Sequence, residues 1–492
     1  MKNLKIKDIV KATNGELIVG NKEAICKKYS KDTRTIKSGD CYIGIKGEAF
    51  DGNLFWEKAL ENGADTVVIQ GVEFTEQDKT KWKNKNIIKV QDTMEALYSI
   101  ARAKRELYDI PVIAITGSVG KTSTKDIVAN VVSQKYKTLK TQGNHNNNIG
   151  LPFTVLELED EEAMVIEMGM NHFGEISVLT SIAKPTICVI TNIGTSHIGN
   201  LGSRENILKA KLEILEGCKN PKVVINNDND LLHKWYVENK EKYDIKTYGI
   251  NEKSLFNAGN IKLQEQSSSF DCNIDGETKN ITINVGGEHF ILNALCAITV
   301  GKEMGISSDK IVKGIESFEL TQKRMDIYDL KDNIKVINDA YNASFESMKA
   351  SLKVLAEYKD HRKIAVLGDM FELGDFAKEL HENVGKEVAK NKIDILIASG
   401  KNSKYIVEKA KEGLKSENIY YLEDKEKIEE LLSRNVTIPE IAKKTNVSKV
   451  SIYEELARNL SLEEYKARRY EKYSAADAQK RAEKEAIEKL RK

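Results

Sequence analysis

Apolar residues in the first hundred positions form short runs, and polar or amphipathic stretches separate one run from the next. The pattern predicts buried strands at CYIGIKG (41–47) and DTVVIQG (65–71). It also predicts a turn that leads into a helix within 50–64, ended by Gly63, and a helix over 92–107. Pro111 then precedes a new apolar run. We therefore place a domain boundary near residue 108.

From residue 109 onward, apolar strands alternate with amphipathic helices. The predicted strands are VIAIT (112–116), AMVIEMG (163–169), TICVITNIG (186–194) and KVVIN (222–226), with helices starting at Thr122 and spanning 205–215. This alternation is typical of a parallel sheet with crossover helices. Residues 257–290 instead alternate apolar and polar positions, which predicts an antiparallel ribbon, and 289–305 predicts a helix.

A third block of strands and helices begins near residue 319. Its predicted strands are VIND (336–339), IAVLGD (364–369) and DILIASG (394–400), which indicates a second, smaller α/β unit of the dinucleotide-fold type. The last 59 residues contain 15 Lys and Arg against 10 Asp and Glu, and this excess predicts a basic helical tail. The expected domains are 1–108, 109–318 and 319–433, followed by the tail 434–492.

Composition and charge add limits to this picture. A chain of 492 residues is long enough for about three domains, and a net charge of +1 gives no indication of a nucleic-acid or membrane partner. The six cysteines are scattered without a C-x-x-C pair, which argues against a zinc site or a disulfide framework. The polar start, and the lack of an apolar stretch approaching about 18 residues, lead us to expect a cytoplasmic protein without a membrane segment.

The segment AITGSVGKTSTKD (114–126) joins a predicted strand to a predicted helix through a glycine turn. Backbone N–H groups and the helix dipole at such a junction favour a phosphate group. Lys121 is expected to reach the β and γ phosphates and the Thr122 hydroxyl to hold Mg²⁺. The general phosphate-loop pattern requires a glycine where this chain has Ile115, so an ordinary GTPase is disfavoured. A purely structural turn is the alternative interpretation.

Other polar residues follow predicted strands. Glu167 ends a buried strand near the loop, and we favour a magnesium-binding role for it over a satisfied edge carboxylate. His197 lies in a loop after the next strand and, by itself, is more often a surface residue. Lys211, by its spacing, is a solvated helix lysine. Arg324 has the planar donors to neutralise a phosphate, or to form a surface ion pair, and Asp339 is placed to bind a ribose hydroxyl.

Taken together, these motifs resemble the Mur ligase family, which extends the peptidoglycan precursor. The resemblance runs from about residue 5 to about residue 432 and rests on several blocks in order. These blocks are TGSVGKTST, GNHNNNIGLPFTVL, EMGMNHFGEI, TNIGTSHIGNLGS, AKLEI, NDAYNASFESM and LGDMFELGDFAKELHENVG. The implied fold class is α/β in three domains: a small uridine-nucleotide domain, a central P-loop parallel-sheet ATPase domain, and a C-terminal dinucleotide-fold-like domain, here with a helical tail.

The resemblance implies roles for individual residues. It implies that the loop binds the phosphates of ATP through Gly117, Ser118, Val119, Gly120, Lys121, Thr122 and Ser123. It further implies two magnesium ions, one held by Thr122 and Glu167 and a second held with the help of His197. Lys211 matches a family lysine that CO₂ carbamylates into a metal-binding anion. Asn293 is implied to lie near adenine, Arg324 at the γ-phosphate and Asp339 at the ribose.

Substrate contacts are also implied by the resemblance. The segment DTRTIKSGDCYIGIKGEAFDG is similar to the uridine-nucleotide site of the family, with Thr33, Arg34, Gly47 and Asp51 as candidates. Contacts to the sugar–peptide region are implied for Asn144, Asn146 and Asn147. The implied reaction joins D-Ala-D-Ala to UDP-N-acetylmuramoyl-tripeptide through an acyl phosphate, in an enzyme that we expect to be a monomer.

Two other interpretations stay open. The first is a related ligase that adds the third amino acid or adds glutamates to folate; the chain lacks a D-N-P-R motif, and the LGDMFELG block disfavours this choice. The second is an impaired ligase core with a DNA-binding tail, because residues 437–456 resemble a helix-turn-helix reader as much as a helical cap.

The chain departs from the family pattern in two places. It has Ser344-Phe345 where the family usually has Asn-Pro, which we expect to loosen a turn and remove a polar contact. The strand and K-G-S-R-type turn that close the third domain are also missing from the sequence.

Overall fold

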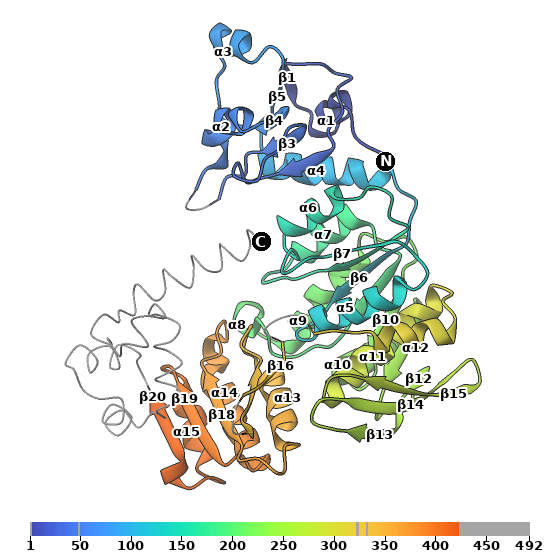
Figure 1. Cartoon of the computed structure of the whole chain (residues 1–492), viewed down its shortest axis with the longest axis vertical. Helices are drawn as coiled ribbons and strands as arrows, with labels where there is room; N and C mark the ends of the chain where they lie inside the picture. The colour runs from blue at the N-terminus through green and yellow to red at the C-terminus, as the bar shows by residue number, and fades with distance from the viewer. Residues whose placement is uncertain (1, 48–49, 321–323, 331–332, 423–492) are drawn as a thin grey trace, which may run out of the picture. The chain divides into compact units, whose positions relative to one another are not determined.

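The computed structural model describes residues 2–47, 50–320, 324–330 and 333–422 (Figure 1). It divides the chain into two compact units. One contains Met1–Gly194 and Leu201–Leu320, and the other contains Thr195–Asn200 and Thr321–Lys492. The expected tail 434–492, with its helix-turn-helix candidate 437–456, lies outside the described residues.

A five-stranded sheet forms the N-terminal part of the first unit. Its strands are β1 (Glu16–Val19), β2 (Lys28–Ser30), β3 (Asp40–Ile43), β4 (Thr66–Ile69) and β5 (Asn86–Lys89), in the order β1-β5-β4-β3-β2. Only β1 runs antiparallel to its neighbour. The accompanying helices are α1 (Ile6–Thr13), η1 (Gly52–Phe55), α2 (Trp56–Glu61), α3 (Glu76–Lys81) and α4 (Thr93–Glu106). The strands and helices predicted in this region are confirmed.

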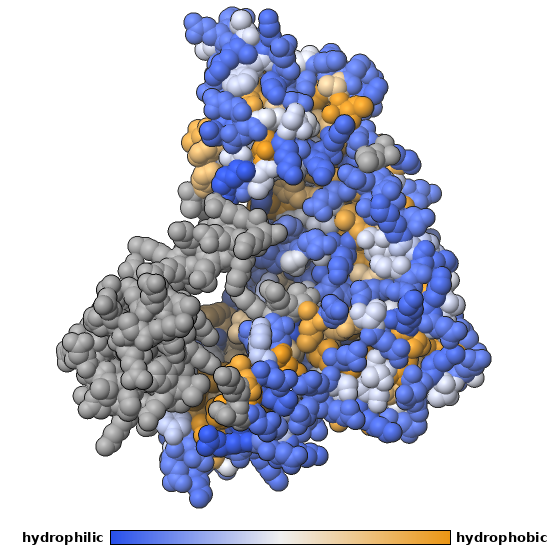
Figure 2. All heavy atoms as spheres, in the orientation of Figure 1, coloured by the Kyte–Doolittle hydropathy of each residue, from blue (hydrophilic) through white to orange (hydrophobic). Residues whose placement is uncertain are grey.

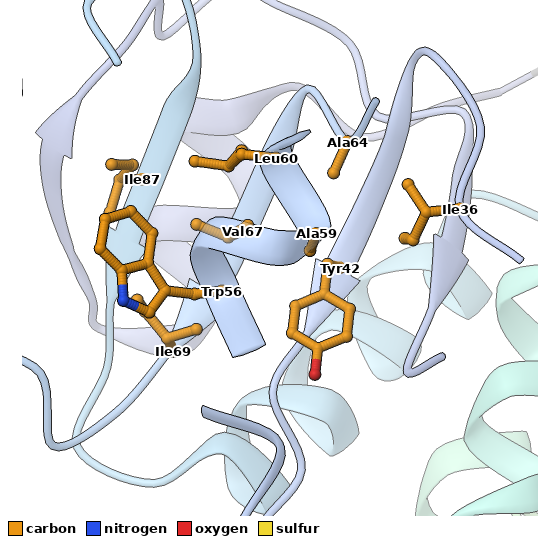
Figure 3. Close-up of a cluster of buried hydrophobic side chains, with 9 residues drawn as sticks. All are labelled: Ile36, Tyr42, Trp56, Ala59, Leu60, Ala64, Val67, Ile69 and Ile87. Carbon is orange, nitrogen blue, oxygen red and sulfur yellow. The ribbon is translucent and has the colours of Figure 1, made fainter. Parts of the chain in front are cut away.

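The α2 side of this sheet has an apolar core around Trp56 and Tyr42 (Figure 3). Trp56 is 8% exposed and packs edge-on against Phe74, with 5.3 Å between the ring centroids. The Tyr42 ring is buried among apolar side chains, and its hydroxyl donates to the Gly52 carbonyl at 2.8 Å. Because that bond satisfies the polar end of a buried phenol, the ring also fixes the turn that precedes α2.

The centre of the first unit is a seven-stranded parallel sheet, as predicted. Its strands are β6 (Val112–Thr116), β7 (Thr138–Lys140), β8 (Ala163–Glu167), β9 (Ile187–Ile190), β10 (Lys222–Asn226), β11 (Asp244–Gly249) and β12 (Phe256–Asn257). The order is β12-β11-β10-β9-β6-β8-β7, and all pairs are parallel. Strand β6 therefore lies between β8 and β9, and the loops that follow these three strands meet at one edge.

Helices and an antiparallel ribbon complete this unit (Figure 1). The helices are α5 (Lys121–Val132), α6 (Gly150–Leu156), α7 (Glu175–Ala183), α9 (Arg204–Leu212), η2 (Glu213–Leu215), α10 (Asp230–Asn239), α11 (Glu288–Glu303) and α12 (Ser308–Glu316). The short helix α8 (Ile198–Leu201) starts in the segment assigned to the second unit. The ribbon, formed by β13 (Gly259–Leu263), β14 (Ser268–Ile274) and β15 (Glu277–Ile283), is antiparallel as predicted.

Helix α5 follows the phosphate-loop candidate, and two glycines let its neighbours approach it closely. A Cβ atom on Gly301 of α11 would lie 2.9 Å from Val131 Cγ1, and one on Gly314 of α12 would lie 2.7 Å from Val131 Cα. Helices α5, α11 and α12 therefore approach one another at Val131 more closely than they could with larger residues at positions 301 and 314. This packing fixes the axis of α5 and so the direction in which its first turn points.

The described part of the second unit contains a β-hairpin and a three-stranded parallel sheet. The hairpin pairs β16 (Asp326–Asp329) with β17 (Lys335–Asn338), and the sheet order is β18 (Ile364–Gly368), β19 (Ile395–Ser399) and β20 (Ile419–Leu422). The helices are α13 (Phe345–Ala356), η4 (Gly374–Phe376), α14 (Ala377–Lys390), α15 (Ser403–Ala410) and η5 (Ser416–Asn418). Strand–helix alternation in this third block is confirmed.

Ser344 begins helix α13 as its N-cap, because its hydroxyl accepts from the Ser347 N–H at 3.3 Å. Phe345 is then the first helical residue, the position where proline is favoured by its fixed φ rather than by a contact. The change from Asn-Pro to Ser-Phe therefore keeps a capping hydrogen bond at a turn where we expected a polar contact to be lost.

No helix among the described residues is long and apolar enough to cross a membrane. In the view of Figure 2, hydrophilic residues cover most of the coloured surface, and apolar side chains appear there as small patches.

Substituting Gly314 by alanine tests the close packing of α5. A helical Gly→Ala change on an open surface stabilises by about 1 kcal/mol, but here the added methyl group would meet the Val131 backbone. We expect Gly314→Ala to lower the free energy of unfolding by about 1–3 kcal/mol, because the overpacked helices must move apart. Urea unfolding followed by circular dichroism measures this change.

Lys313→Ala is the matched control, since Lys313 precedes Gly314 on the same helix and is exposed. Equal stability of the two variants would contradict the packing argument.

Candidate functional site

The turn between β6 and α5 depends on two glycines. Gly117 has φ +153°, and a Cβ atom there would lie 1.9 Å from Thr191 Oγ1, so only glycine fits beside the end of β9. Gly120 has φ +79° and is the N-cap of α5. The first N–H groups of α5 have no carbonyl partner within the helix, so they are suited to an anion, as predicted from the sequence.

Asn192, which follows β9, holds the loop in place. Its side-chain Oδ1 accepts the N–H groups of Ser118 and Val119, each at 3.0 Å. On the other side of the loop, the Ser118 hydroxyl accepts the Gly194 N–H at 2.9 Å. These two loop amides therefore point at Asn192 in this structure, which leaves the start of α5 as the part that presents amides to a phosphate.

The Lys121 ammonium folds back onto its own loop, where it donates to the Gly117 carbonyl at 2.9 Å and lies 3.4 Å from the Ser118 carbonyl. Both acceptors are neutral carbonyl groups, and a phosphate oxygen would offer the ammonium a full negative charge instead. The Lys121 ammonium therefore lies against the loop that was predicted to bind phosphate.

Glu167, at the end of β8, is 2% exposed, accepts two side-chain hydrogen bonds and donates one from its backbone. Thr122 Oγ1 donates to Oε2 at 2.9 Å, and Asn146 Nδ2 donates to Oε1 at 2.7 Å. The backbone N–H of Glu167 donates to Thr141 Oγ1 at 3.0 Å. The structure therefore brings together Thr122 and Glu167, the two residues that the sequence assigned to one metal ion.

These donors fit Mg²⁺, which prefers oxygen ligands and is commonly bound by one or two carboxylates together with substrate phosphates. No cluster of three or more His, Cys, Asp or Glu side chains that would suit a metal occurs among the residues that the structure describes. A magnesium site formed by the Thr122 hydroxyl, the Glu167 carboxylate and substrate phosphates does not need such a cluster.

Lys211 lies on α9 and is 1% exposed, so the prediction from spacing alone, a solvated helix lysine, is wrong. Burial, and then the charge of the nearby Lys121 ammonium, lower the pKa of Lys211 well below its usual value. A lysine in this environment favours its neutral form, and a neutral amine is the form that reacts with CO₂. The family assignment, and not the spacing, anticipated an unusual lysine at this position.

Asn293, on α11, lies beside the start of α5. Its Oδ1 accepts the Thr124 hydroxyl at 2.9 Å, and its Nδ2 is buried without a hydrogen-bond partner in the structure. A Cβ atom on Gly120 would lie 3.6 Å from Asn293 Oδ1. A buried amide donor without a partner is costly, and a bound ligand with an acceptor atom would relieve that cost.

His197 belongs to the other compact unit, since the loop Thr195–Asn200 is grouped with the C-terminal residues. Its Nδ1 is hydrogen-bonded to the Glu372 carboxylate, and its φ of +63° is left-handed. The compact unit that contains Thr122 and Glu167 therefore does not contain His197.

Arg324 and Asp339 lie near each other in the second unit. The Arg324 guanidinium stacks over the Tyr341 ring, 4.1 Å from its centroid. Burial raises the pKa of Asp339, while a hydrogen bond from Ser351 Oγ at 2.5 Å and the charge of Arg324 oppose that increase. Both side chains are thus held by their neighbours at the end of β17.

Three models from one family match the chain. The "Mur ligase family, catalytic domain" matches residues 29–105, the "Mur ligase middle domain" 115–301, and the "Mur ligase, glutamate ligase domain" 323–438. The UDP-N-acetylmuramoyl-tripeptide–D-alanyl-D-alanine ligase of Bacillus subtilis (strain 168) is 35% identical over an alignment that covers 88% of this chain and 93% of the relative. The chain belongs to the Mur ligase family.

Solved structures of other Mur ligases resemble the chain closely. A crystal structure of MurF from Acinetobacter baumannii has a TM-score of 0.77 at 29% identity, covering 89% of this chain and 92% of that one. The MurF ligase of Thermotoga maritima in complex with ADP has a TM-score of 0.71 at 26% identity, covering 83% and 91%. The three-domain α/β architecture expected from the resemblance is confirmed.

The Mur ligase resemblance also singled out residues in the N-terminal part. Arg34 is exposed and forms a two-pronged ion pair with Asp32, with donor–acceptor distances of 2.8 and 2.7 Å. The Thr33 carbonyl accepts the side-chain amide of Asn62 at 2.8 Å. Gly47 N–H donates to the Phe50 carbonyl at 2.8 Å.

Asp51 caps the following helical turn. Its Oδ1 accepts from the Asn53 backbone at 2.9 Å and the Asn53 side chain at 2.8 Å. These hydrogen bonds lower the pKa of Asp51. Asp51 therefore has a local structural role as the N-cap of η1, whether or not it also contacts substrate.

The asparagines after β7 have different neighbours. Asn146 binds the Glu167 carboxylate, as described above, and Asn147 Oδ1 accepts the N–H of Gly150, the first residue of α6, at 2.8 Å. The backbone carbonyl of Asn144 accepts from Asn146 N–H at 2.7 Å. Asn146 thus lies at the metal-binding candidate of this Mur ligase, a place that the sequence interpretation did not give it.

The sequence interpretation missed Asn192, whose side chain accepts two N–H groups of the loop, and Thr141, whose hydroxyl accepts the Glu167 N–H. The available signal for Asn192 was its place near the C-terminal end of the predicted strand 186–194. Thr141 follows β7, a strand that was not predicted, so no predicted element pointed to it.

Replacing Gly117 tests the loop geometry. Gly117→Ala would force its Cβ onto Thr191 Oγ1, so the loop must shift and its amides and Lys121 lose their alignment. We expect the Kd for ADP to rise about tenfold to a hundredfold, the equivalent of one lost charge-assisted hydrogen bond. Isothermal titration calorimetry with ADP and Mg²⁺ measures this change.

Gly276→Ala is the control, because Gly276 also has a left-handed φ (+86°) but has open space around the added methyl group, in the β14–β15 turn. An unchanged Kd in Gly117→Ala would contradict the proposed loop constraint.

Proposed function

We propose that the chain is an ATP-dependent ligase that joins D-Ala-D-Ala to UDP-N-acetylmuramoyl-tripeptide in peptidoglycan precursor synthesis. The observation that carries the proposal is the Thr122–Glu167 pair, held at 2.9 Å at the start of a phosphate-loop helix, in a chain 35% identical to a ligase of that name. Relatives with the same name and the ADP complex of the Thermotoga maritima ligase support it further.

The chemistry follows from the poor reactivity of a carboxylate toward an amine. Transfer of the ATP γ-phosphoryl group to the terminal carboxylate of the tripeptide forms an acyl phosphate and releases ADP. The amine of D-Ala-D-Ala then attacks the carbonyl carbon, the new C–N bond forms, and inorganic phosphate leaves with the former carboxylate oxygen. The proton lost by the amine passes to a base or to water.

The chain's residues contribute mainly charge and position. The Lys121 ammonium and the first-turn amides of α5 are suited to the phosphates, and Arg324 to the γ-phosphate. Thr122 and Glu167 would hold one Mg²⁺, and His197 with a carbamylated Lys211 would hold a second. These ions would offset charge on the transferring phosphoryl group.

Carbamylation of Lys211 follows from its burial. The neutral amine attacks CO₂, a C–N bond forms, and loss of one proton leaves a carbamate anion. An anion beside Lys121 is favourable where a second ammonium is not, since the charge of Lys121 lowers the pKa of Lys211 further after burial has lowered it. Carbamylation would therefore replace the repulsion between the Lys121 and Lys211 ammonium groups by an attraction between an ammonium and an anion.

Other contacts complete the proposal. Asn293, with its unpartnered Nδ2, is assigned to the adenine and Asp339 to the ribose of ATP. The uridine nucleotide is assigned to Thr33, Arg34, Gly47 and Asp51, and the sugar–peptide region to Asn144, Asn146 and Asn147. A cytoplasmic location is part of the proposal, because the reaction consumes ATP. The domain division at 108 and 318, and a monomeric state, are also proposed.

Phosphate release from the full-length chain tests the proposed reaction. With MgATP, UDP-N-acetylmuramoyl-tripeptide and D-Ala-D-Ala together, we expect steady release, and with either acceptor substrate omitted we expect the background rate. Single amino acids in place of D-Ala-D-Ala separate the related ligases. If a folded sample releases phosphate at the same rate with and without D-Ala-D-Ala, this compound is not the substrate.

Substitutions at Lys211 test the carbamate. Lys211→Ala and Lys211→Arg should each lose activity by about a hundredfold or more, because neither supplies a metal-binding anion. Added bicarbonate should not restore Lys211→Arg, since its guanidinium stays protonated.

Equilibration with ¹³C-bicarbonate gives a readout besides activity. We expect a protein-bound carbamate resonance in the ¹³C NMR spectrum of the unmodified chain and none in Lys211→Arg. Normal turnover in either variant would contradict the assignment.

A further inference from the structure

The loop Thr195–Asn200 follows β9 and precedes α9 in the sequence, yet it is grouped with the C-terminal residues. Two glutamates of that unit bind the loop. Glu346 lies in the first turn of α13, and Glu372 follows β18 in the LGDMFELG block. Neither residue was singled out from the sequence.

Glu346 binds the start of the loop with both carboxylate oxygens. Oε1 accepts the Thr195 backbone N–H at 2.8 Å, and Oε2 accepts the Thr195 hydroxyl at 3.0 Å. A carboxylate in the first turn of a helix is stabilised there by the helix dipole, and α13 is itself capped by Ser344. Thr195 is therefore attached to a fixed charge on a well-defined helix.

Glu372 binds the middle of the loop. Its carboxylate is hydrogen-bonded to His197 Nδ1, and its backbone carbonyl accepts the Gly199 N–H at 2.9 Å. His197 and Glu372 both have left-handed backbones, with φ of +63° and +60°. The same residue thus holds both the imidazole and the backbone two positions later.

The two backbones also approach more closely than a side chain would allow. A Cβ atom on Gly199 would lie 2.6 Å from the Glu372 carbonyl oxygen and 2.6 Å from the Gly374 nitrogen. Such an approach needs glycine at position 199. The contact is therefore shape-specific as well as electrostatic.

We propose that Glu346 and Glu372 are positioning residues that attach the 195–200 loop to the C-terminal unit and orient the His197 imidazole. A carboxylate that accepts the Nδ1 proton fixes the histidine tautomer and leaves the lone pair on Nε2, the arrangement common for metal-binding histidines. The attachment stands on the contacts alone. The orienting role rests on the proposed function, in which His197 helps to bind the second magnesium ion.

Hydrogen–deuterium exchange of the full chain, without nucleotide or metal, tests the attachment. Glu346→Ala removes both acceptors of Thr195, and Glu372→Ala removes the acceptor of His197. We expect peptides that span 195–200 to exchange about tenfold faster or more in each variant. Glu346→Gln, which keeps the shape and one strong acceptor, should show a smaller increase.

Glu379→Ala is the matched control, because Glu379 is an exposed glutamate in the first turn of α14, near Glu372 in sequence. It should exchange as the unmodified chain does. Gly199→Ala gives the same test without a change of charge, and thermal unfolding checks that each variant is folded. Unchanged exchange in folded Glu346→Ala, Glu372→Ala and Gly199→Ala would overturn the attachment.

A double-mutant cycle on phosphate release tests the orienting role. Glu372→Ala should lower kcat about tenfold to a hundredfold, with little change in KM for the tripeptide substrate. If Glu372 acts through His197, the double variant Glu372→Ala/His197→Ala should be no slower than His197→Ala. Multiplied losses, or full activity of His197→Ala, would overturn the orienting role.

Failure of the proposed function gives a different result. If the unmodified chain shows no release that depends on D-Ala-D-Ala, the reaction is wrong, while the exchange experiment still decides whether the loop is attached.

Discussion

The buried carboxylate of Glu167 is the constraint on which the phosphate end of the site depends. A charge at 2% exposure is costly unless several polar groups compensate it, and here a hydroxyl and an amide donate to its two oxygens. Those donors come from the first turn of α5 and from the loop after β7. The carboxylate therefore fixes the ends of separate elements relative to one another, and it does so at the edge where β6, β8 and β9 terminate.

The helix that carries Thr122 is positioned by packing at its other end. Val131 lies where Gly301 and Gly314 bring α11 and α12 unusually close to α5. Helix α5 is twelve residues long, and because it is rigid it transmits this placement to its first turn. The loop amides and Lys121 therefore keep their direction. Apolar packing far from the chemistry and a polar network beside it thus set the same geometry. Neither alone determines where a phosphate is held.

Several parts of this arrangement were predictable from the sequence. The run VIAIT became β6 with the predicted bounds, and the family resemblance implied the pairing of Thr122 with Glu167. The burial of Lys211 did not follow from the helical pattern, because periodicity describes one helix and not what covers it. Asn192 and Thr141 act through hydrogen bonds to residues distant in the sequence, which leave no periodic signal.

The 195–200 loop shows why sequence neighbours are a poor guide to the structural neighbours of a functional residue. His197 follows β9, a strand of the central sheet, but its Nδ1 is hydrogen-bonded to Glu372, 175 positions away. The attachment needs Glu346 at a defined place, and that place is defined because Ser344 starts helix α13 with a capping bond. A change from Asn-Pro to Ser-Phe that looked disruptive in the sequence therefore preserves the one property that the loop requires, a fixed helix start. The cap, helix α13 and the Glu346 carboxylate together fix Thr195, two positions before His197.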